Sequence, residues 1–183
     1  MLERIKDVLD NPSWDQSIER EPLLAFSFYL NGRVINLLQI GDEIIDHLDV
    51  GFSDKNSVDS SRVGRAGVLM WLWILGAYEI VRTMCQAKTC FSEQIYKELL
   101  RLKRLLAKVR MPEAKMEKPG KRMPVNSNRS PDGWDFADRD LLVGDPENDS
   151  FASARFLITE FDKVMSSIKK EDVLCHHKNT YEI

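Results

Sequence analysis

Residues 66–81 read AGVLMWLWILGAYEIV, and a helix built from them is apolar on every side. Such a helix must be buried all round or lie in a membrane. Between Arg65 and Glu79 the chain holds thirteen uncharged residues, whereas a membrane span needs about 20. The sequence therefore predicts the central helix of a bundle, with Trp71 in the core, and no membrane span.

Apolar residues recur every three or four positions in four stretches, which is the spacing of amphipathic helices. We expect an all-α fold, a helical bundle of four main helices in one domain spanning residues 1–183. The two long helices should be antiparallel neighbours, because a short loop joins them. The predicted helices cover residues 22–48, 61–87, 92–111 and 150–168.

The helix boundaries have local signals. Pro22 suits a first helical position, because its missing N–H would be unpaired there anyway. Ser92 and Ser150 are good N-cap residues, and Met111 followed by Pro112 should end the third helix.

Three segments lie outside these helices: an N-terminal arm or short helix, a long loop insertion and a flexible polar tail. A loop of this length is unusual in a compact bundle. Within it, residues 134–136 and 141–143 can pair as a small β-hairpin. The three segments cover residues 1–20, 112–150 and 170–183.

The cysteines, Cys85, Cys90 and Cys175, are too few and too scattered for a disulfide framework. The N-terminal residues lack the apolar run of a secretory signal, and both features favour a reducing, cytoplasmic location. With His176 and His177, the cysteines do not have the spacing of a zinc site. No phosphate-binding glycine motif is present, so we expect neither metal nor cofactor.

Charge is strongly segregated along the chain. Residues 1–60 carry a net charge of −7, whereas residues 97–122 carry ten cations against three carboxylates. Such a basic region can neutralise the phosphates of a nucleic acid, although no aromatic residue lies on its stripe. The alternative is a solvated helix whose cations pair with the acidic segments. The candidate nucleic-acid-binding residues are Lys97, Arg101, Arg104, Lys108, Lys115 and Lys118.

Two further features are candidates for a catalytic site. Glu79 and Arg82 are three apart on one helix and can form a structural ion pair or, alternatively, an anion site. His47 lies at the end of the first predicted long helix, among carboxylates. A protonated histidine there stabilises the helix C-terminus, and the alternative is a role as a general base. A divergent ribonuclease would need all three side chains in one pocket. We assign no catalytic residue, and these three are the candidates.

The residues LGAYEIVRTM (75–84), together with the long helix before them and MPEAKMEKPGK (111–121), resemble bacterial HEPN-like helical bundles. The resemblance implies a small ribonuclease or an inert partner in toxin–antitoxin and phage-defence systems, commonly a dimer. The ribonuclease members have an arginine followed four to six residues later by a histidine. This chain lacks that motif, so the resemblance implies a non-catalytic member in which only Glu79 and Arg82 correspond.

We therefore expect a cytoplasmic, non-catalytic HEPN-like protein of bacterial or phage origin that forms a homodimer. It would bind RNA, or a partner protein in a defence or toxin–antitoxin setting, through residues 97–122. One alternative is a protein–protein adaptor or dimeric scaffold, with an exposed apolar patch on the first long helix around Phe28 and Tyr29. The other alternative is the divergent ribonuclease.

Overall fold

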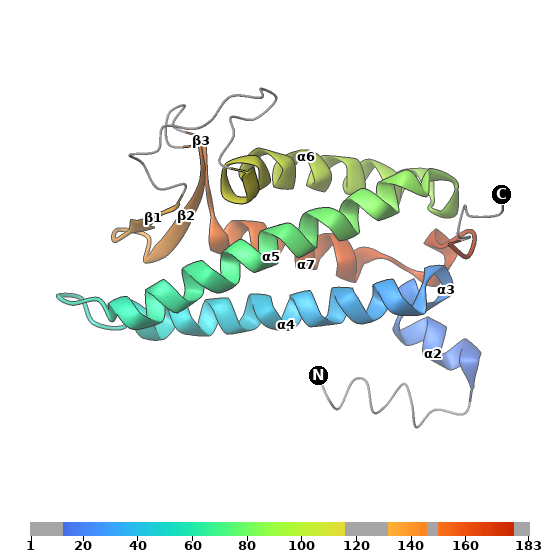
Figure 1. The fold of residues 1–183 in the computed structure, drawn as a ribbon. Helices are drawn as coiled ribbons and strands as arrows, with labels where there is room; N and C mark the ends of the chain where they lie inside the picture. Colours follow the sequence, from blue (N-terminus) through green and yellow to red (C-terminus); the bar gives the residue numbers. More distant parts are fainter. Residues whose placement is uncertain (1–12, 116–131, 146–149, 178–183) are drawn as a thin grey trace.

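A computed structural model describes residues 13–115, 132–145 and 150–177 (Figure 1). Within these ranges the chain forms six α-helices and a three-stranded sheet. The fold is therefore mainly a helical bundle, as predicted, but it is not purely all-α. The helices are α2 (Trp14–Arg20), α3 (Leu23–Phe26), α4 (Phe28–Gly51), α5 (Ser60–Gln86), α6 (Glu93–Lys115) and α7 (Ala154–Ser167).

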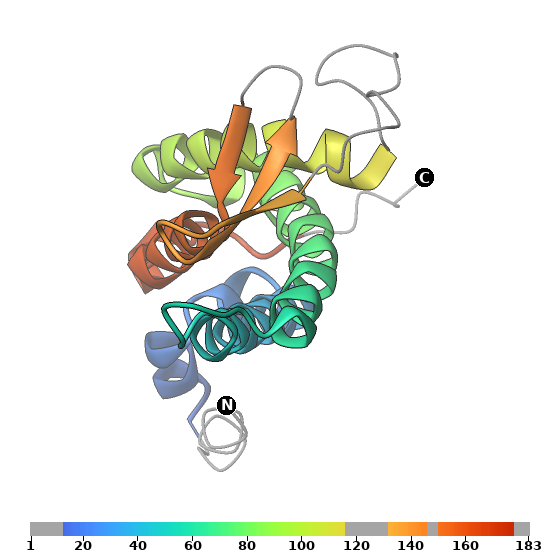
Figure 2. The ribbon, with the colours of Figure 1, turned by 90° about the vertical axis from the view of Figure 1, so that its left-hand side faces the viewer.

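Helix α5 is the central element of this bundle. It begins beside the C-terminal end of α4 and runs antiparallel to it, then diverges from α4 toward the beginning of α6 (Figure 1). In the end-on view, α4, α7 and α6 surround one side of α5 (Figure 2). No described helix or strand covers its other side.

The first long helix of the prediction is divided at Ser27. This residue has an extended backbone, and its hydroxyl accepts a hydrogen bond from the Leu30 N–H at 3.2 Å. Ser27 thereby caps α4 and separates it from the single turn of α3. Serine favours such a cap because its side chain satisfies an N–H that the helix leaves unpaired, so the predicted continuous helix from residue 22 is wrong at this point.

Only one side of α5 is buried. Ala66, Met70 and Ala77 are fully buried, whereas Val68 and Leu72 on the opposite side are 52% and 49% exposed. Among the described residues, α5 is the helix whose length and composition would allow a membrane span. Of its most apolar stretch, 44% is buried inside the protein. The predicted burial on all sides is therefore wrong, and the exposed side is a feature to be explained.

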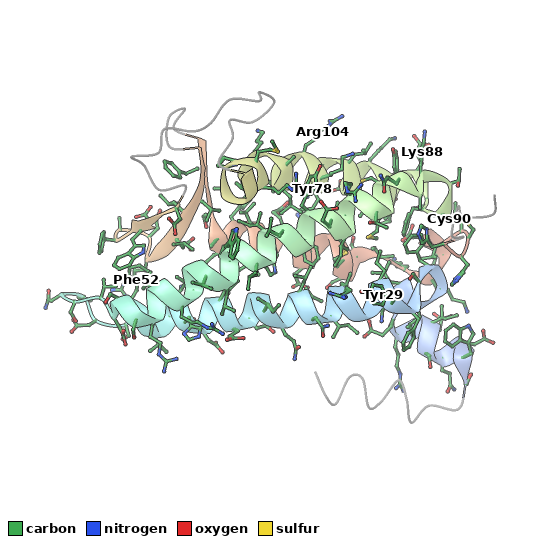
Figure 3. The ribbon with its side chains drawn as sticks, in the orientation of Figure 1. Tyr29, Phe52, Tyr78, Lys88, Cys90 and Arg104 are labelled. Atoms are coloured by element: carbon green, nitrogen blue, oxygen red, sulfur yellow. A yellow bond between two sulfur atoms is a disulfide. The ribbon has the colours of Figure 1, made fainter. Side chains whose placement is uncertain are left out.

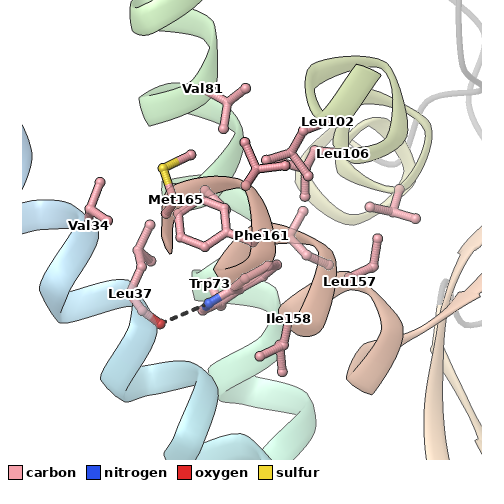
Figure 4. Packing of buried hydrophobic residues seen from close by; sticks show 14 of the residues in the cluster. Val34, Leu37, Trp73, Val81, Leu102, Leu106, Leu157, Ile158, Phe161 and Met165 are labelled. Atoms are coloured by element: carbon pink, nitrogen blue, oxygen red, sulfur yellow. Dashed lines mark hydrogen bonds between the residues drawn. The ribbon is translucent and has the colours of Figure 1, made fainter. Parts of the chain in front are cut away.

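The core tryptophan is Trp73, and the expectation that Trp71 fills the core is wrong. Trp73 is fully buried, and its indole N–H donates to the Leu37 carbonyl at 3.0 Å (Figure 4). Its ring meets Phe161 of α7 edge to face, with centroids 5.4 Å apart. Trp71 is 44% exposed. In a run that is apolar on every side, spacing does not distinguish the two.

The predicted hairpin is present and gains a third strand. Strands β1 (Asp132–Asp135), β2 (Asp140–Asp145) and β3 (Ser150–Ser153) form an antiparallel sheet in that order. Leu141 and Val143 are buried in the core. The last helix thus begins at Ala154 rather than at Ser150, because residues 150–153 pair with the otherwise open edge of β2.

Helix α6 has the predicted start and a later end than predicted. The Ser92 hydroxyl accepts a hydrogen bond from the Ile95 N–H at 3.4 Å, as expected of its cap. Pro112 lies inside the helix, which continues to Lys115. A proline in the last turns removes one backbone hydrogen bond and leaves few turns to disrupt beyond it, so it does not end α6 where predicted.

The segment after α7 is attached to the bundle as far as residue 177, in contrast to the predicted flexible tail, and residues 178–183 of that tail lie outside the described residues. The Ser92 N–H donates to Asp172, the Leu174 N–H to Cys90 and the His177 N–H to Phe26. Cys90 and Cys175 form a disulfide across 85 residues of sequence. Disulfides are typical of oxidising compartments, so cysteine usage no longer supports the cytoplasmic prediction.

Candidate binding surfaces

Helix α6 separates an apolar side from a basic one. Ile95, Leu99, Leu102, Leu106 and Val109 are buried in the core. On the opposite, exposed side lie Lys97, Arg101, Arg104 and Lys108, which we call the basic face. Figure 3 shows Arg104 pointing outward from α6. Lys118 and the side chain of Lys115, the other two predicted members, lie outside the described residues.

The first half of the basic face is neutralised by carboxylates. The Lys97 ammonium lies 2.7 Å from Glu93. The Arg101 guanidinium lies 2.9 Å from Glu98 and 2.6 Å from Glu160 of α7. Hydrogen bonding to Glu98, and then to Glu160, raises the pKa of Arg101 above its ordinary value. These two cations therefore form ion pairs within the protein, as the alternative interpretation of the basic region expected.

The second half of the basic face carries uncompensated charge. Arg104 and Lys108 are exposed, and no carboxylate of the described residues lies within ion-pair distance of either. The sequence explains why, since residues 99–112 contain five cations and no carboxylate. The positive potential of α6 is therefore concentrated on its second half.

Two tyrosines lie close to cations, one of α6 and one of the turn between α5 and α6. The Arg110 guanidinium lies over the ring of Tyr78, 4.8 Å from its centroid. The Lys88 ammonium lies over Tyr96 at 5.4 Å, and Figure 3 shows Tyr78 and Lys88 on the same side of the molecule as Arg104. Sequence reasoning did not place these tyrosines beside cations, because it considered the stripe alone, whereas Tyr78 comes from the neighbouring helix.

The predicted Glu79–Arg82 pair is formed, and a third residue joins it. Arg82 lies 2.6 Å from the Glu79 carboxylate, and Arg110 of α6 lies 3.4 Å from its other oxygen. The buried Arg110 Nε has no hydrogen-bond partner among the described residues. Two guanidiniums therefore share one carboxylate at the α5–α6 contact, which ties the two helices together.

His47 does not join Glu79 and Arg82. It lies 3.8 Å from Glu43 and 3.4 Å from Arg62, near the beginning of α5. Arg62 precedes Glu79 by seventeen residues on this helix, which is about 26 Å at 1.5 Å per residue. The three catalytic candidates therefore do not converge in one pocket. Within the described part of the chain, no cluster of three or more His, Cys, Asp or Glu side chains could hold a metal ion.

A groove of about 890 Å³ lies between α4 and α5, on the side of α5 that no described element covers. We call it the α4–α5 groove. Its apolar lining residues are Leu30, Leu37, Ile40, Leu72, Gly76 and Ile80. Its main polar and charged lining residues are Tyr29, Arg33, Asn36, Glu79, His176 and His177. The sequence had assigned these two histidines to a flexible tail, so their place in a groove was not foreseen.

Large apolar side chains are exposed around this groove. Phe28 and Tyr29 are 66% and 68% exposed at the beginning of α4, where the adaptor alternative expected a patch. Leu72 lines the groove and is half exposed. Val68 and Trp71 are exposed on the same helix, one turn or less from Leu72. The exposed apolar surface is therefore shared by α4 and α5.

Comparison of this chain with protein-family models, with curated proteins and with solved structures finds no match.

Proposed function

We propose that this protein is a non-catalytic helical bundle that binds RNA through the second half of the basic face. One observation carries the proposal: Arg104 and Lys108 are exposed cations with no carboxylate partner among the described residues. Phosphates would supply the missing negative charge and release their bound counterions. Lys97 and Arg101, which already have carboxylate partners, contribute less.

Single-stranded RNA is the nucleic acid that this surface favours. Tyr78 lies beside Arg110 of the second half of α6 at 4.8 Å, and Tyr96 lies beside Lys88 at the beginning of α6 at 5.4 Å. Unpaired bases stack on aromatic rings next to arginine or lysine, whereas a duplex keeps its bases stacked inside. We therefore expect tighter binding to single-stranded RNA than to duplex DNA.

The biological setting belongs to the same proposal and rests on the HEPN-like resemblance around residues 75–84. We propose an inert homodimeric partner in a bacterial or phage toxin–antitoxin or defence system. The engagement of Glu79 by Arg82 and Arg110, together with the distance of His47 from them, supports a role without catalysis.

The test is fluorescence anisotropy with labelled single-stranded RNA and labelled duplex DNA across a salt series. We expect affinity for RNA to fall steeply with salt. Each single-strand phosphate contact adds about −0.7 to the slope of log K against log salt. The double variant Arg104→Glu/Lys108→Glu should lose RNA binding, and the control Lys97→Glu should retain most of it. Equal binding by wild type and the double variant would contradict the proposal.

The same RNA, recovered and run on a denaturing gel, tests the absence of catalysis. Intact RNA after prolonged incubation is the expected result. Cleavage that persists after repeated purification, and that is lost in a variant of Glu79 or Arg82, would favour the ribonuclease alternative.

Protein binding is a second candidate function, because exposed apolar side chains surround the α4–α5 groove. Phe28, Tyr29 and Leu72 are each about half to two thirds exposed. Contiguous exposed apolar surface of this kind commonly marks a protein interface.

A further inference from the structure

The α4–α5 groove results from the divergence of the two long helices. They are in close contact at the beginning of α5, where a Cβ on Gly51 would lie 2.7 Å from the Val63 side chain. Toward the other end α5 rises away from α4, while α7 fills only the inner side (Figures 1 and 2). The outer side stays open as a groove, and the apolar side chains at its base belong to the core that α4 and α5 share.

The dimensions of the groove suit a helix. Leu72 and Thr83 line it from α5 and are eleven residues apart, which corresponds to about 17 Å, or about three helical turns. On α4, Leu30, Leu37 and Ile40 line it at intervals of seven and three residues. Two helices with apolar residues at such intervals can accept the apolar stripe of a third, as in helix-in-groove recognition.

The edges of the groove add an aromatic ring and an apolar side chain to its apolar base. Tyr29 on the α4 side is 68% exposed and Leu72 on the α5 side is 49% exposed. A partner helix lying between them would remove both side chains from water. Burial of these two side chains would contribute favourably to the free energy of binding, and the bundle without a partner does not gain it.

The charges along the groove indicate which charge a partner helix should carry. Arg33 lines the groove, and its guanidinium has no carboxylate partner among the described residues. It is stacked 4.8 Å from the Tyr29 ring centroid and hydrogen-bonded to the Tyr29 hydroxyl. Glu79, the one carboxylate among the described lining residues, already has two arginine partners. His176 and His177 add further donors at the same end.

One end of the groove is held in place before any partner binds. The His177 N–H donates to the Phe26 carbonyl at 2.8 Å, and the His176 ring contacts the Ala25 carbonyl at 3.2 Å. The disulfide at Cys175 fixes the same segment to Cys90. A preformed end reduces the entropy lost on binding.

We infer that the α4–α5 groove is the docking site for an acidic amphipathic helix of a partner protein. Its apolar stripe would lie on Leu37, Leu72 and Ile80, and its carboxylates would face Arg33 and the two histidines. None of the described residues that line the groove belongs to the basic face, so RNA on Arg104 and Lys108 and a helix in the groove would bind at the same time.

Two labelled synthetic peptides test this inference with the full chain. Each is about 18 residues long, or five turns, with leucines at positions i, i+4, i+7 and i+11. The remaining positions are Glu and Gln in one peptide and Lys and Gln in the other. Measured by anisotropy, the acidic peptide should bind saturably and at least about tenfold more tightly than the basic one. Absence of binding by the acidic peptide, or a preference for the basic peptide, would overturn the inference.

Matched variants locate the binding. Leu72→Asp should weaken binding of the acidic peptide at least about tenfold, as loss of an apolar anchor does. Val50→Asp is its control, because Val50 and Leu72 are both 49% exposed but Val50 lies outside the groove. Arg33→Glu should abolish the preference for the acidic peptide, whereas Arg65→Glu, another exposed arginine, should not. Equal effects of a variant and its control would overturn the inference.

The same variants distinguish other occupants of the groove. If the wild-type chain sediments as a dimer and Leu72→Asp as a monomer, the groove belongs to a second copy and the inference is wrong. If removal of residues 178–183 raises peptide affinity more than about tenfold, the chain's own end occupies the groove and the inference is again wrong. Arg104→Glu/Lys108→Glu should bind the acidic peptide normally, whatever its effect on RNA.

Discussion

Helices α5 and α6 are both long and partly exposed, but the sequence predicts the orientation of only one of them. In α6, cations at intervals of three and four residues mark the solvent side, and the apolar stripe opposite them is buried. In α5, apolar residues surround the helix, so spacing does not indicate which side faces α4 and α7. The difference teaches that polar residues, more than apolar ones, define the orientation of a helix in this bundle.

The largest expected effect separates the two neighbouring tryptophans of α5. Trp73→Ala should lower the free energy of unfolding by about 3–5 kcal/mol, because it removes a fully buried ring and opens a cavity. Trp71→Ala should cost no more than about 1 kcal/mol, since that ring is 44% exposed. Urea unfolding of both variants measures the difference. Equal losses would mean that α5 is rotated from the orientation described.

The disulfide is expected to have the next largest effect. It closes a loop of 85 residues, so Cys90→Ser/Cys175→Ser should lower the free energy of unfolding by about 2–4 kcal/mol. Wild type in excess dithiothreitol should lose a similar amount, and Cys85→Ser, which keeps the disulfide, should lose the same amount in dithiothreitol as wild type. Burial raises the pKa of the Cys85 thiol, which keeps it in the unreactive form. Insensitivity of wild type to reductant would contradict this role for the disulfide.

The cap of α7 tests the sheet-to-helix junction. The Ser153 hydroxyl accepts from the Phe156 N–H at 3.1 Å and is hydrogen-bonded to the buried Asp140. Ser153→Ala should therefore lower the free energy of unfolding by about 1–2 kcal/mol, and Ser153→Thr should recover part of it. Thermal unfolding of the three proteins provides the measurement. If Ser153→Ala leaves the free energy of unfolding unchanged, Ser153 does not cap α7 and the helix begins elsewhere.

The smallest expected effect is the pH dependence of the α5 cap. Hydrogen bonds from the Ser61 side chain and then the Arg62 backbone lower the pKa of Asp59 in the folded protein. A lowered folded pKa stabilises the protein above the unfolded value of about 3.9, and this contribution is lost as the pH falls through the folded pKa. Wild type should therefore lose stability relative to Asp59→Asn between pH 5 and pH 3. A constant difference in urea unfolding across that range would contradict the assignment.

Sequence reasoning predicted most of the helices and the small hairpin, because each has a local signal in spacing, caps or turn residues. It missed β3, because residues 150–153 become a strand only by pairing with β2. It missed the Cys90–Cys175 pair, since no local pattern joins residues 85 positions apart.

The candidate sites divide in the same way. The basic face follows from the spacing within α6, but its neutralised half depends on Glu160 from α7. The α4–α5 groove combines residues of α4, α5 and the C-terminal segment. Only Phe28 and Tyr29, which lie outside the predicted buried stripe of the first long helix, indicated an exposed apolar surface here from the sequence.

The proposed division of roles between α6 and α5 is most directly tested by an amide chemical-shift titration with single-stranded RNA. Shifts are expected for residues 101–110 of α6 and for Tyr78 and Tyr96, with Tyr29 and Leu72 unchanged. Shifts concentrated at Tyr29 and Leu72, with α6 unaffected, would contradict the proposed roles of the two helices.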